Sequence, residues 1–443
     1  MKTLRLALFG AVPALAHHLL SRLSDFGVQC QSPSLLPDLI GRPTCSSDST
    51  TLMTRHGEIQ NTSIHSKWHI STPCAQNGSE VYCAYSYPSF ARGRGITVLT
   101  TPERAEQLAQ STVFLNETLL NDISNLNAID NPKWALQSIS GKDIGVVATQ
   151  RFEVGDHIMS ATPSIMVDYG IFDALEAQYI SRLQAAGIDL LPPSHRADFL
   201  NLSTHDPVET HEDRIGKVLL TNAFDLASAG DIQESDDANS WYTVFPHVSR
   251  FNHDCRPNAD YYFDPVTFTQ RVHAVRPILP GEEITISYMD LIQTREERRQ
   301  RIQNTWHFDC SCSLCTQDAE QIAASDARIR QVIEIREQLR DYSSASQATA
   351  QMAELMVSLY EQERMWAMLY EAYTYAAIEW NGVGEPWLAT KYARLAIQYG
   401  LACGGPKDSD VIHMKELAKD PWSHWSWMLR TKKRMNWGSK VSA

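Results

Sequence analysis

The chain has 443 residues, of which 43% are hydrophobic and 21% are charged, and its formal net charge is −13. This composition excludes a disordered chain and allows two or three domains. The acidic balance argues against direct nucleic-acid binding as the main activity. A basic partner such as a lysine-rich tail would meet a favourable field, although the same charge also serves solubility alone. No run of 18 apolar residues follows the first segment, so we expect no membrane span.

The first 16 residues have the layout of a secretory signal peptide. Met1–Arg5 is short and basic, and Leu6–Ala16 is apolar and ends in Ala14-Leu15-Ala16, which is a small-x-small cleavage pattern. We therefore predict a signal peptide at residues 1–16 and entry into the secretory pathway. The open alternative is an amphipathic start of an intracellular protein.

Residues 17–130 are rich in Ser, Thr, Pro and Asn, and we expect loops, short strands and one helix over 102–121. The segment contains Asn-x-Ser/Thr sequons and four cysteines, Cys30, Cys45, Cys74 and Cys83. Four cysteines allow two disulfides with three possible pairings, and the spacing does not choose among them.

From Trp134 the pattern changes to short apolar runs separated by glycine, which is typical of strands. We expect strands at 135–139, 145–149, 157–166, 241–244, 259–263, 270–275 and 283–287. Residues 172–226 have a helical apolar period instead, so this part is predicted as a β-rich core with a helical insert.

The last part of the chain is predicted to be mostly helical. Small and large apolar residues recur at helical spacing at Ala389, Tyr392, Ala393, Ala396 and Ile397. We expect this helix to stop at Gly400 and again at Gly404-Gly405.

Three short motifs follow one another between residues 249 and 315. They are Ser249-Arg250-Phe251-Asn252-His253-Asp254-Cys255-Arg256-Pro257-Asn258, then Gly281-Glu282-Glu283-Ile284-Thr285-Ile286-Ser287-Tyr288, then Cys310-Ser311-Cys312-Ser313-Leu314-Cys315. Three thiols so close together suit one metal ion better than separate disulfide bridges. A tetrahedral site then needs a fourth ligand.

In this order and at this spacing, the motifs resemble those of the SET-domain protein-lysine methyltransferases, in particular the SMYD/SET5-like branch. The resemblance implies an α+β fold with a SET-domain β core and helical insert at 131–290. A zinc-bound post-SET loop at 291–320 and an α-helical, tetratricopeptide-like domain at 321–443 would follow. Residues 160–240 contain no cysteine, so no MYND finger is expected, as in the fungal SET5-like arrangement.

The resemblance also implies S-adenosylmethionine as methyl donor and zinc as a structural metal. The zinc ligands would be Cys255, Cys310, Cys312 and Cys315. The cofactor contacts would be Gly141, Lys142, Asn222, Asn252, His253 and Phe308. Tyr288 would be the catalytic tyrosine, and Phe224 and Trp306 would line the channel for the target lysine. Close relatives have tyrosine where this chain has Trp306, so the methylation state of the product stays open.

One position departs from the family pattern. Asp143 stands where the second glycine of a Gly-x-Gly cofactor loop is expected, and its carboxylate could repel the carboxylate of the donor. We predict an S-adenosylmethionine-dependent protein-lysine N-methyltransferase that acts on a histone or another protein. The alternative is a non-catalytic SET-fold binding protein in the secretory pathway. The family resemblance, unlike the signal peptide, favours the nucleus or cytoplasm.

Overall fold

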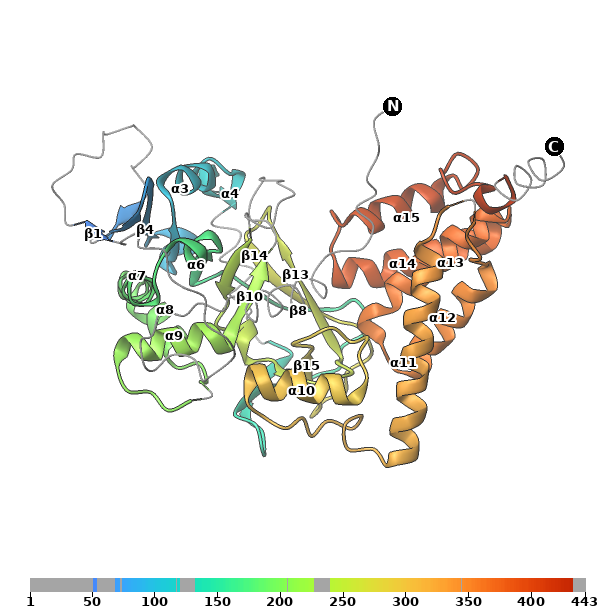
Figure 1. Ribbon diagram of the computed structural model, residues 1–443, viewed down its shortest axis with the longest axis horizontal. Helices are drawn as coiled ribbons and strands as arrows, with labels where there is room; N and C mark the ends of the chain where they lie inside the picture. The colour runs from blue at the N-terminus through green and yellow to red at the C-terminus, as the bar shows by residue number, and fades with distance from the viewer. Residues whose placement is uncertain are drawn as a thin grey trace.

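The computed structural model describes residues 51–53, 68–71, 74–116, 118–119, 132–204, 206–226, 240–343 and 345–432. The predicted signal peptide and two of the early cysteines, Cys30 and Cys45, lie outside the described residues. A β-rich body occupies the middle of the molecule, with the early strands on one side and the C-terminal helices on the other (Figure 1).

The largest sheet joins the early part of the chain to the predicted SET core. Its strand order is β1-β3-β4-β5-β9-β11-β10, with β2 paired to β4. The strands are β1 (Thr51–Met53), β2 (His69–Ile70), β3 (Cys74–Asn77), β4 (Glu80–Tyr87), β5 (Ile96–Thr100), β9 (Ile165–Asp168), β10 (Ala223–Leu226) and β11 (Trp241–Val244). Because β5 pairs in parallel with β9, strands on both sides of the predicted boundary at residue 130 share one sheet. A disulfide between Cys74 and Cys83 joins β3 to β4.

Two smaller sheets, with orders β12-β15-β7-β6 and β13-β14-β8, complete the β structure of the described residues. Their strands are β6 (Trp134–Ser138), β7 (Ile144–Ala148), β8 (His157–Ala161), β12 (Asn252–His253), β13 (Ala259–Asp264), β14 (Thr269–Ala274) and β15 (Glu283–Ile286). The predicted strand over 157–166 is instead the two strands β8 and β9, with Pro163 between them. Proline has no N–H to donate to a sheet, which accounts for this break.

The helical insert lies between β9 and β11, as predicted, except that it ends in the strand β10. The helices up to the cysteine motif are α2 (Phe90–Gly93), α3 (Pro102–Ala109), α4 (Thr112–Leu115), α6 (Gly170–Ala174), α7 (Ala177–Asp189), α8 (Pro193–Leu200), α9 (His211–Asn222), the 3-10 turn η2 (Val248–Arg250) and α10 (Arg295–Trp306). The single helix expected over 102–121 is wrong, because α3 ends at Ala109. There the Ser111 hydroxyl donates to the Leu108 carbonyl at 2.8 Å, and α4 begins one residue later.

The C-terminal part is helical, as predicted. It consists of α11 (Ala319–Arg340), α12 (Ala350–Gln362), the 3-10 turn η3 (Trp366–Met368), α13 (Leu369–Gly382), α14 (Pro386–Cys403) and α15 (Ser409–Lys419). The expected stop at Gly400 is wrong, since α14 continues through it. A Cβ at Gly400 would come within 2.7 Å of Val411 Cγ2, so this glycine allows close packing against α15. Among the described helices, none combines the length and apolar character needed to cross a bilayer.

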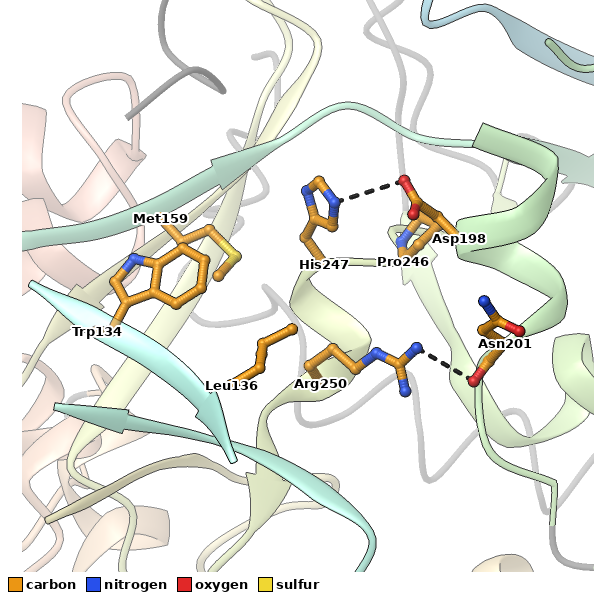
Figure 2. Close-up of a pocket in the computed structure, with 8 residues that line it drawn as sticks. All are labelled: Trp134, Leu136, Met159, Asp198, Asn201, Pro246, His247 and Arg250. Carbon is orange, nitrogen blue, oxygen red and sulfur yellow. Dashed lines mark hydrogen bonds and ion pairs between the residues drawn. The ribbon is translucent and has the colours of Figure 1, made fainter. Parts of the chain in front are cut away.

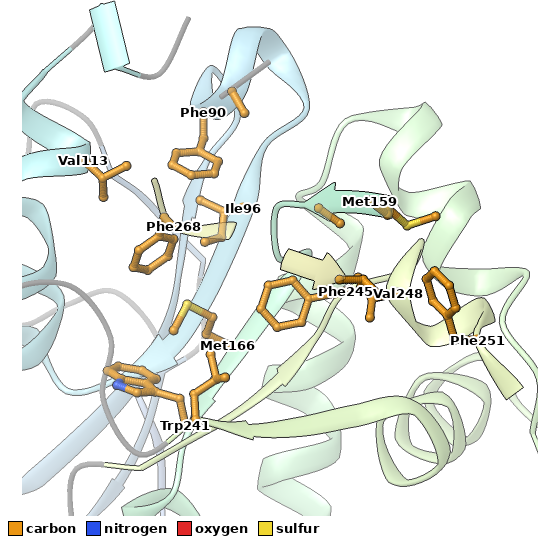
Figure 3. Packing of buried hydrophobic residues seen from close by; sticks show 14 of the residues in the cluster. Phe90, Ile96, Val113, Met159, Met166, Trp241, Phe245, Val248, Phe251 and Phe268 are labelled. Carbon is orange, nitrogen blue, oxygen red and sulfur yellow. The ribbon is translucent and has the colours of Figure 1, made fainter. Parts of the chain in front are cut away.

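An aromatic core packs the early strands against the predicted SET core (Figure 3). Phe90 and Phe114 come from the early part of the chain, and both pack against Phe268 of the β13–β14 turn. The Phe114 and Phe268 ring centroids are 5.3 Å apart in an edge-on arrangement. Burying such a ring contributes roughly 1.5 to 3 kcal/mol, so the early strands stabilise the same core as the predicted catalytic segment.

A buried ion pair attaches the C-terminal helices to the predicted SET core. Arg256 Nη2 lies 2.8 Å from Glu363 Oε2, and both side chains are almost fully buried. Ser325 and Arg328 of α11 also donate to the Glu363 carboxylate, each at 2.7 Å. Since Arg256 directly follows Cys255, the helical domain is anchored next to a predicted zinc ligand.

Candidate functional site

The parallel pairing of β12 with β15 brings His253 next to Tyr288. The register places His253 opposite Ile286, two residues before Tyr288. The Tyr288 N–H donates to His253 Nδ1 at 3.2 Å, and the Tyr288 hydroxyl donates to the Phe251 carbonyl at 2.8 Å. Burial, followed by the nearby Glu283 carboxylate, raises the pKa of Tyr288 well above its usual value. The phenol is therefore a fixed, neutral group.

The four predicted zinc ligands converge in one cluster. The sulfur atoms of Cys255, Cys310, Cys312 and Cys315 all lie within 4.8 Å of one another. The Cys255 sulfur lies 3.9 Å from that of Cys310 and 3.6 Å from that of Cys315. Zn–S bonds of about 2.3 Å in a tetrahedron separate the sulfurs by about 3.8 Å. The cluster therefore fits a tetrahedral zinc ion held by four thiolates.

His253 connects this cluster to Tyr288. Its Nε2 lies 3.4 Å from the Cys255 sulfur, while its Nδ1 accepts from the Tyr288 backbone. Burial lowers the pKa of His253 to about 3, so the ring is neutral near pH 7. A neutral ring that accepts at Nδ1 carries its proton at Nε2, which points the N–H at the thiolate.

One buried cation balances the charge of the thiolates. Arg298 of α10 is 1% exposed and also donates to the Gln293 carbonyl at 2.5 Å. Burial alone would lower the pKa of Arg298, but the thiolates of Cys255 and Cys315 raise it above its usual value. Four thiolates around Zn²⁺ carry a net charge of about −2, so an adjacent guanidinium stabilises the loaded cluster.

Aromatic side chains lie near Tyr288 and His253. The Trp306 ring lies 5.3 Å from that of Tyr288, and the Phe308 ring lies 6.5 Å from that of His253. The Phe224 ring packs edge-on against Tyr261 at 5.0 Å. Tyr261 was not singled out from the sequence. Burial raises the pKa of Tyr261, and the nearby carboxylates of Asp260 and Asp225 and the hydroxyl of Tyr288 raise it further, so Tyr261 and Tyr288 lie close together. No motif marks Tyr261, because it lies within an ordinary strand.

Glu283 ties together two of the predicted cofactor contacts. Its Oε2 lies 2.6 Å from Lys142 Nζ, and its Oε1 accepts from Asn252 Nδ2 at 2.9 Å. The backbone is also tight here, because a Cβ at Gly145 would come within 2.7 Å of Asn252 Nδ2. Sequence reasoning assigned no role to Glu283 or Gly145. The second glycine of Gly141-Lys142-Asp143-Ile144-Gly145 was the sequence signal that could have indicated a close backbone approach at Gly145.

The predicted cofactor loop is the turn between β6 and β7. Gly141 has a φ of +74°, the left-handed region that glycine favours, whereas Asp143 has no such conformation. The backbone at residue 143 therefore does not require glycine. The Ser203 hydroxyl donates to the Asp143 carboxylate, and Asn222 donates to the Ser203 carbonyl at 2.9 Å. Asn222 thus braces the loop through Ser203.

A pocket lies between β6, β8, α8 and η2 (Figure 2). It is lined by Trp134, Leu136, Met159, Asp198, Asn201, Pro246, His247 and Arg250. His247 Nε2 lies 3.6 Å from Asp198 Oδ2, and Arg250 donates to the Asn201 carbonyl at 3.1 Å. None of the predicted site residues lines this pocket. Arg250 nevertheless lies near Asp143. Burial lowers the pKa of Arg250, and the Asp143 carboxylate partly offsets this change.

Comparisons with known proteins find similarity over this part of the chain. The SET domain family model matches residues 143–289. Histone-lysine N-methyltransferase set5 of Schizosaccharomyces pombe is 28% identical over 208 residues, which cover 47% of this chain and 58% of that protein. Human histone-lysine N-methyltransferase SMYD3 is 41% identical over 78 residues, covering 17% of this chain and 18% of that protein. Zebrafish N-lysine methyltransferase SMYD2-B is 29% identical over 99 residues, or 22% of each chain. The matches therefore span less than two thirds of these relatives.

Proposed function

This chain carries a SET domain similar to those of the Set5 and SMYD lysine methyltransferases, and on that premise we propose that it is an S-adenosylmethionine-dependent protein-lysine N-methyltransferase. The observation that carries the proposal is the hydrogen-bonded series from Tyr288 through His253 to the Cys255 thiol cluster. Three motifs that are separate in the sequence meet there in one buried site. The relatives are all named as methyltransferases, which does not favour a non-catalytic binding protein.

The donor site would be formed by the two motifs that Glu283 holds together. When bound, S-adenosylmethionine supplies an electrophilic methyl group on its sulfonium sulfur. Lys142 offers a cation for the donor carboxylate, and Asn252 offers an amide beside it. Phe308 would stack on the adenine next to His253. These groups fit the donor because they combine one cation, one amide and one aromatic ring near His253 and Glu283.

The residues around Tyr288 would receive the target lysine. A lysine must lose its proton before it can attack, and its reference pKa is about 10.4. Burial between Phe224, Tyr261 and Trp306 would remove water from the ammonium, and this desolvation favours the neutral amine. The Tyr288 hydroxyl donates its proton to the Phe251 carbonyl, so the lone pairs of the Tyr288 oxygen are available to orient the amine. The contribution of the protein is thus positioning and desolvation.

The metal would have a structural role. Cys255 lies at the end of β12, and the three other cysteines follow α10, so one zinc ion would join these two segments. Trp306 and Phe308 lie just before those cysteines. Zinc would therefore hold the aromatic wall of the channel in place without contacting either substrate.

The proposed substrate class is based on the relatives, two of which are named histone-lysine N-methyltransferases and one an N-lysine methyltransferase. We therefore propose a lysine in a protein, with histones as the first substrates to test. The net charge of −13 suits a basic polypeptide of this kind.

The compartment is a separate proposal. The Cys74–Cys83 disulfide supports an oxidising compartment, as expected for a chain that enters the secretory pathway. Thiol labelling of Cys74 and Cys83 in protein rapidly quenched from cells tests this. Full labelling without reductant, together with nuclear or cytoplasmic localisation, would support the alternative of an intracellular enzyme.

The test of the function uses the full, zinc-loaded chain. Calorimetry should show micromolar binding of S-adenosylmethionine, and labelled methyl transfer to histones should appear. Tyr288→Phe should keep donor binding and lose roughly 100-fold or more in transfer rate, since it removes a positioning group only. Absence of donor binding in folded, zinc-containing protein would exclude the enzyme and leave a SET-fold binding protein.

A further inference from the structure

A cluster of exposed tryptophans lies on the C-terminal helical domain, outside the site described above. Trp387, at the start of α14, is 77% exposed, and Trp422, in the segment after α15, is 53% exposed. Their ring centroids are 6.3 Å apart and their planes are nearly perpendicular, at 89°. Trp427 adds a third ring 6.3 Å from Trp422, at 58°. Large aromatic residues grouped on a surface in this way are typical of binding sites.

The backbone that presents these rings is firmly held. Asn381, at the end of α13, is fully buried and donates to the Pro421 carbonyl at 2.9 Å and to the Ser426 hydroxyl at 2.8 Å. The Met428 N–H donates back to the Asn381 carbonyl at 3.0 Å. The segment over 421–428 is therefore fixed on the α13–α14 corner, which keeps Trp422 next to Trp387.

The chemistry of this corner favours a cation. The face of an indole ring is electron-rich, and two perpendicular faces attract a positive charge placed between them. Glu385, which precedes Pro386 of α14, is exposed and adds a negative charge close in the chain to Trp387. Asp420 lies two residues before Trp422, but its carboxylate accepts from the Ser423 hydroxyl at 2.6 Å and lies near Lys419. The whole chain, with its net charge of −13, adds to the same field. Trp387 and Trp422 are the open part of the corner, because both side chains are more than half exposed.

We propose that the Trp387–Trp422 corner binds a methylated ammonium group, namely the side chain of a trimethylated lysine in a basic protein segment. Methyl groups spread the charge and weaken its hydration, so a trimethylammonium loses less than a bare ammonium when it enters an aromatic corner. The site is separate from the residues around Tyr288 and does not depend on the transfer reaction. If the chain is a methyltransferase, the corner would retain proteins that already carry the product.

The test is calorimetry of the full chain with three forms of one basic peptide, supported by tryptophan fluorescence. The forms carry trimethyl-lysine, unmodified lysine, or a neutral side chain in which a tert-butyl group replaces the trimethylammonium. We expect the trimethyl-lysine peptide to bind about tenfold more tightly than either of the others. Trp387→Ala and Trp422→Ala should each remove this preference.

Two variants serve as matched controls. Trp425 lies in the same segment and is 43% exposed, but its ring packs against Tyr342, so Trp425→Ala should keep the preference. Tyr288→Phe should keep it as well, which separates the corner from the transfer site. Equal affinity for the charged and neutral peptides would overturn the proposal, as would equal loss in Trp425→Ala. So would a dimer that Trp387→Ala dissociates, since the corner would then be an interface between two copies.

Discussion

The two walls of the candidate site are built in opposite ways. The thiol wall consists of His253, Tyr288 and the four cysteines. Apart from Cys312, these side chains are largely buried, and short contacts join them. The loop wall over 141–143 is exposed and is held by Glu283 and Ser203. The difference teaches that the residues of the proposed transfer site are fixed in the core, whereas the proposed donor side depends on a few polar contacts that solvent can reach.

The largest expected effect comes from removing a thiolate. Cys310→Ser should lose zinc and reduce methyl transfer by roughly a hundredfold or more, because Trp306 and Phe308 lose their support. Metal analysis and labelled methyl transfer measure the two effects, and a chelator should reproduce them. Cys403→Ser is the control, since Cys403 is buried outside the cluster and should leave the zinc content unchanged. A zinc-free Cys310→Ser protein with full activity would show that the thiol wall does not need the metal.

The anchor behind the thiol wall should give the next largest effect. Glu363→Gln leaves the buried Arg256 guanidinium without its anion, and breaking a buried pair costs roughly 3 to 5 kcal/mol. Denaturant unfolding measures this loss. Glu153→Gln breaks the exposed pair with Arg151 and should cost less than about 1 kcal/mol. Similar losses in the two variants would mean that the helical domain does not stabilise the zinc side of the core.

A substitution of Glu283 in the loop wall should mainly change the KM for S-adenosylmethionine. Glu283→Gln removes the charge that holds Lys142 and should raise the KM for S-adenosylmethionine about tenfold, since hydrogen bonds to charged groups are worth about 1.5 kcal/mol. Steady-state kinetics separate this from an effect on kcat. Glu282→Gln is the neighbouring control, because Glu282 pairs with Arg276 instead. An equal rise in both variants would show that Glu283 has no special part in the donor site.

A smaller effect should appear as a pH dependence of stability on the loop side. His195 precedes the loop-bracing Ser203 and lies between Ser164 and the Arg94 carbonyl. Burial, and then the Arg94 cation, lowers the pKa of His195 to about 3, against a usual value of about 6.5. The unfolded chain therefore binds the extra proton first, so this contribution is complete above pH 6.5 and declines as the pH falls toward 3.

The measurement is the thermal midpoint of the full chain from pH 7.5 down to pH 4, with His195→Gln beside the unmodified protein. We expect the midpoint of the unmodified protein to fall more steeply below about pH 6.5 than that of the variant, because glutamine does not titrate. Other buried histidines, such as His253, titrate in both proteins and cancel in the difference. Parallel curves would mean that His195 does not couple folding to pH.

Local spacing predicted only part of the thiol wall. Cys310, Cys312 and Cys315 are close in the chain, so their spacing alone indicated one metal ion, and the structure brings them together with Cys255. The choice of Cys255 and Tyr288 came from the family resemblance, and the role of Tyr288 stays a prediction. The parallel pairing that joins these motifs was not predicted, because β12 has only two residues and no periodicity.

The contacts that sequence reasoning missed join distant segments. Arg256 and Glu363 are 107 positions apart, and Lys142 and Glu283 are 141 apart. The sheet that joins β5 to β9 likewise connects segments on both sides of the helix α3. Pairings of this kind depend on how whole elements pack, which residue type and period do not encode. The same reason explains why Asp143 stood out in the sequence while its partner Ser203 did not.

The smallest expected effect is therefore at the position where the sequence departs from its family. Asp143 is exposed, accepts a hydrogen bond from Ser203 and lies near the Arg250 cation, so its charge is already offset and screened. Asp143→Gly should change the KM for S-adenosylmethionine by less than about threefold, and Asp143→Asn should behave in the same way. A tenfold gain in donor affinity in both variants would show that the carboxylate repels the donor. A gain in Asp143→Gly alone would point to the backbone instead, and either result would make the loop wall the element that limits activity.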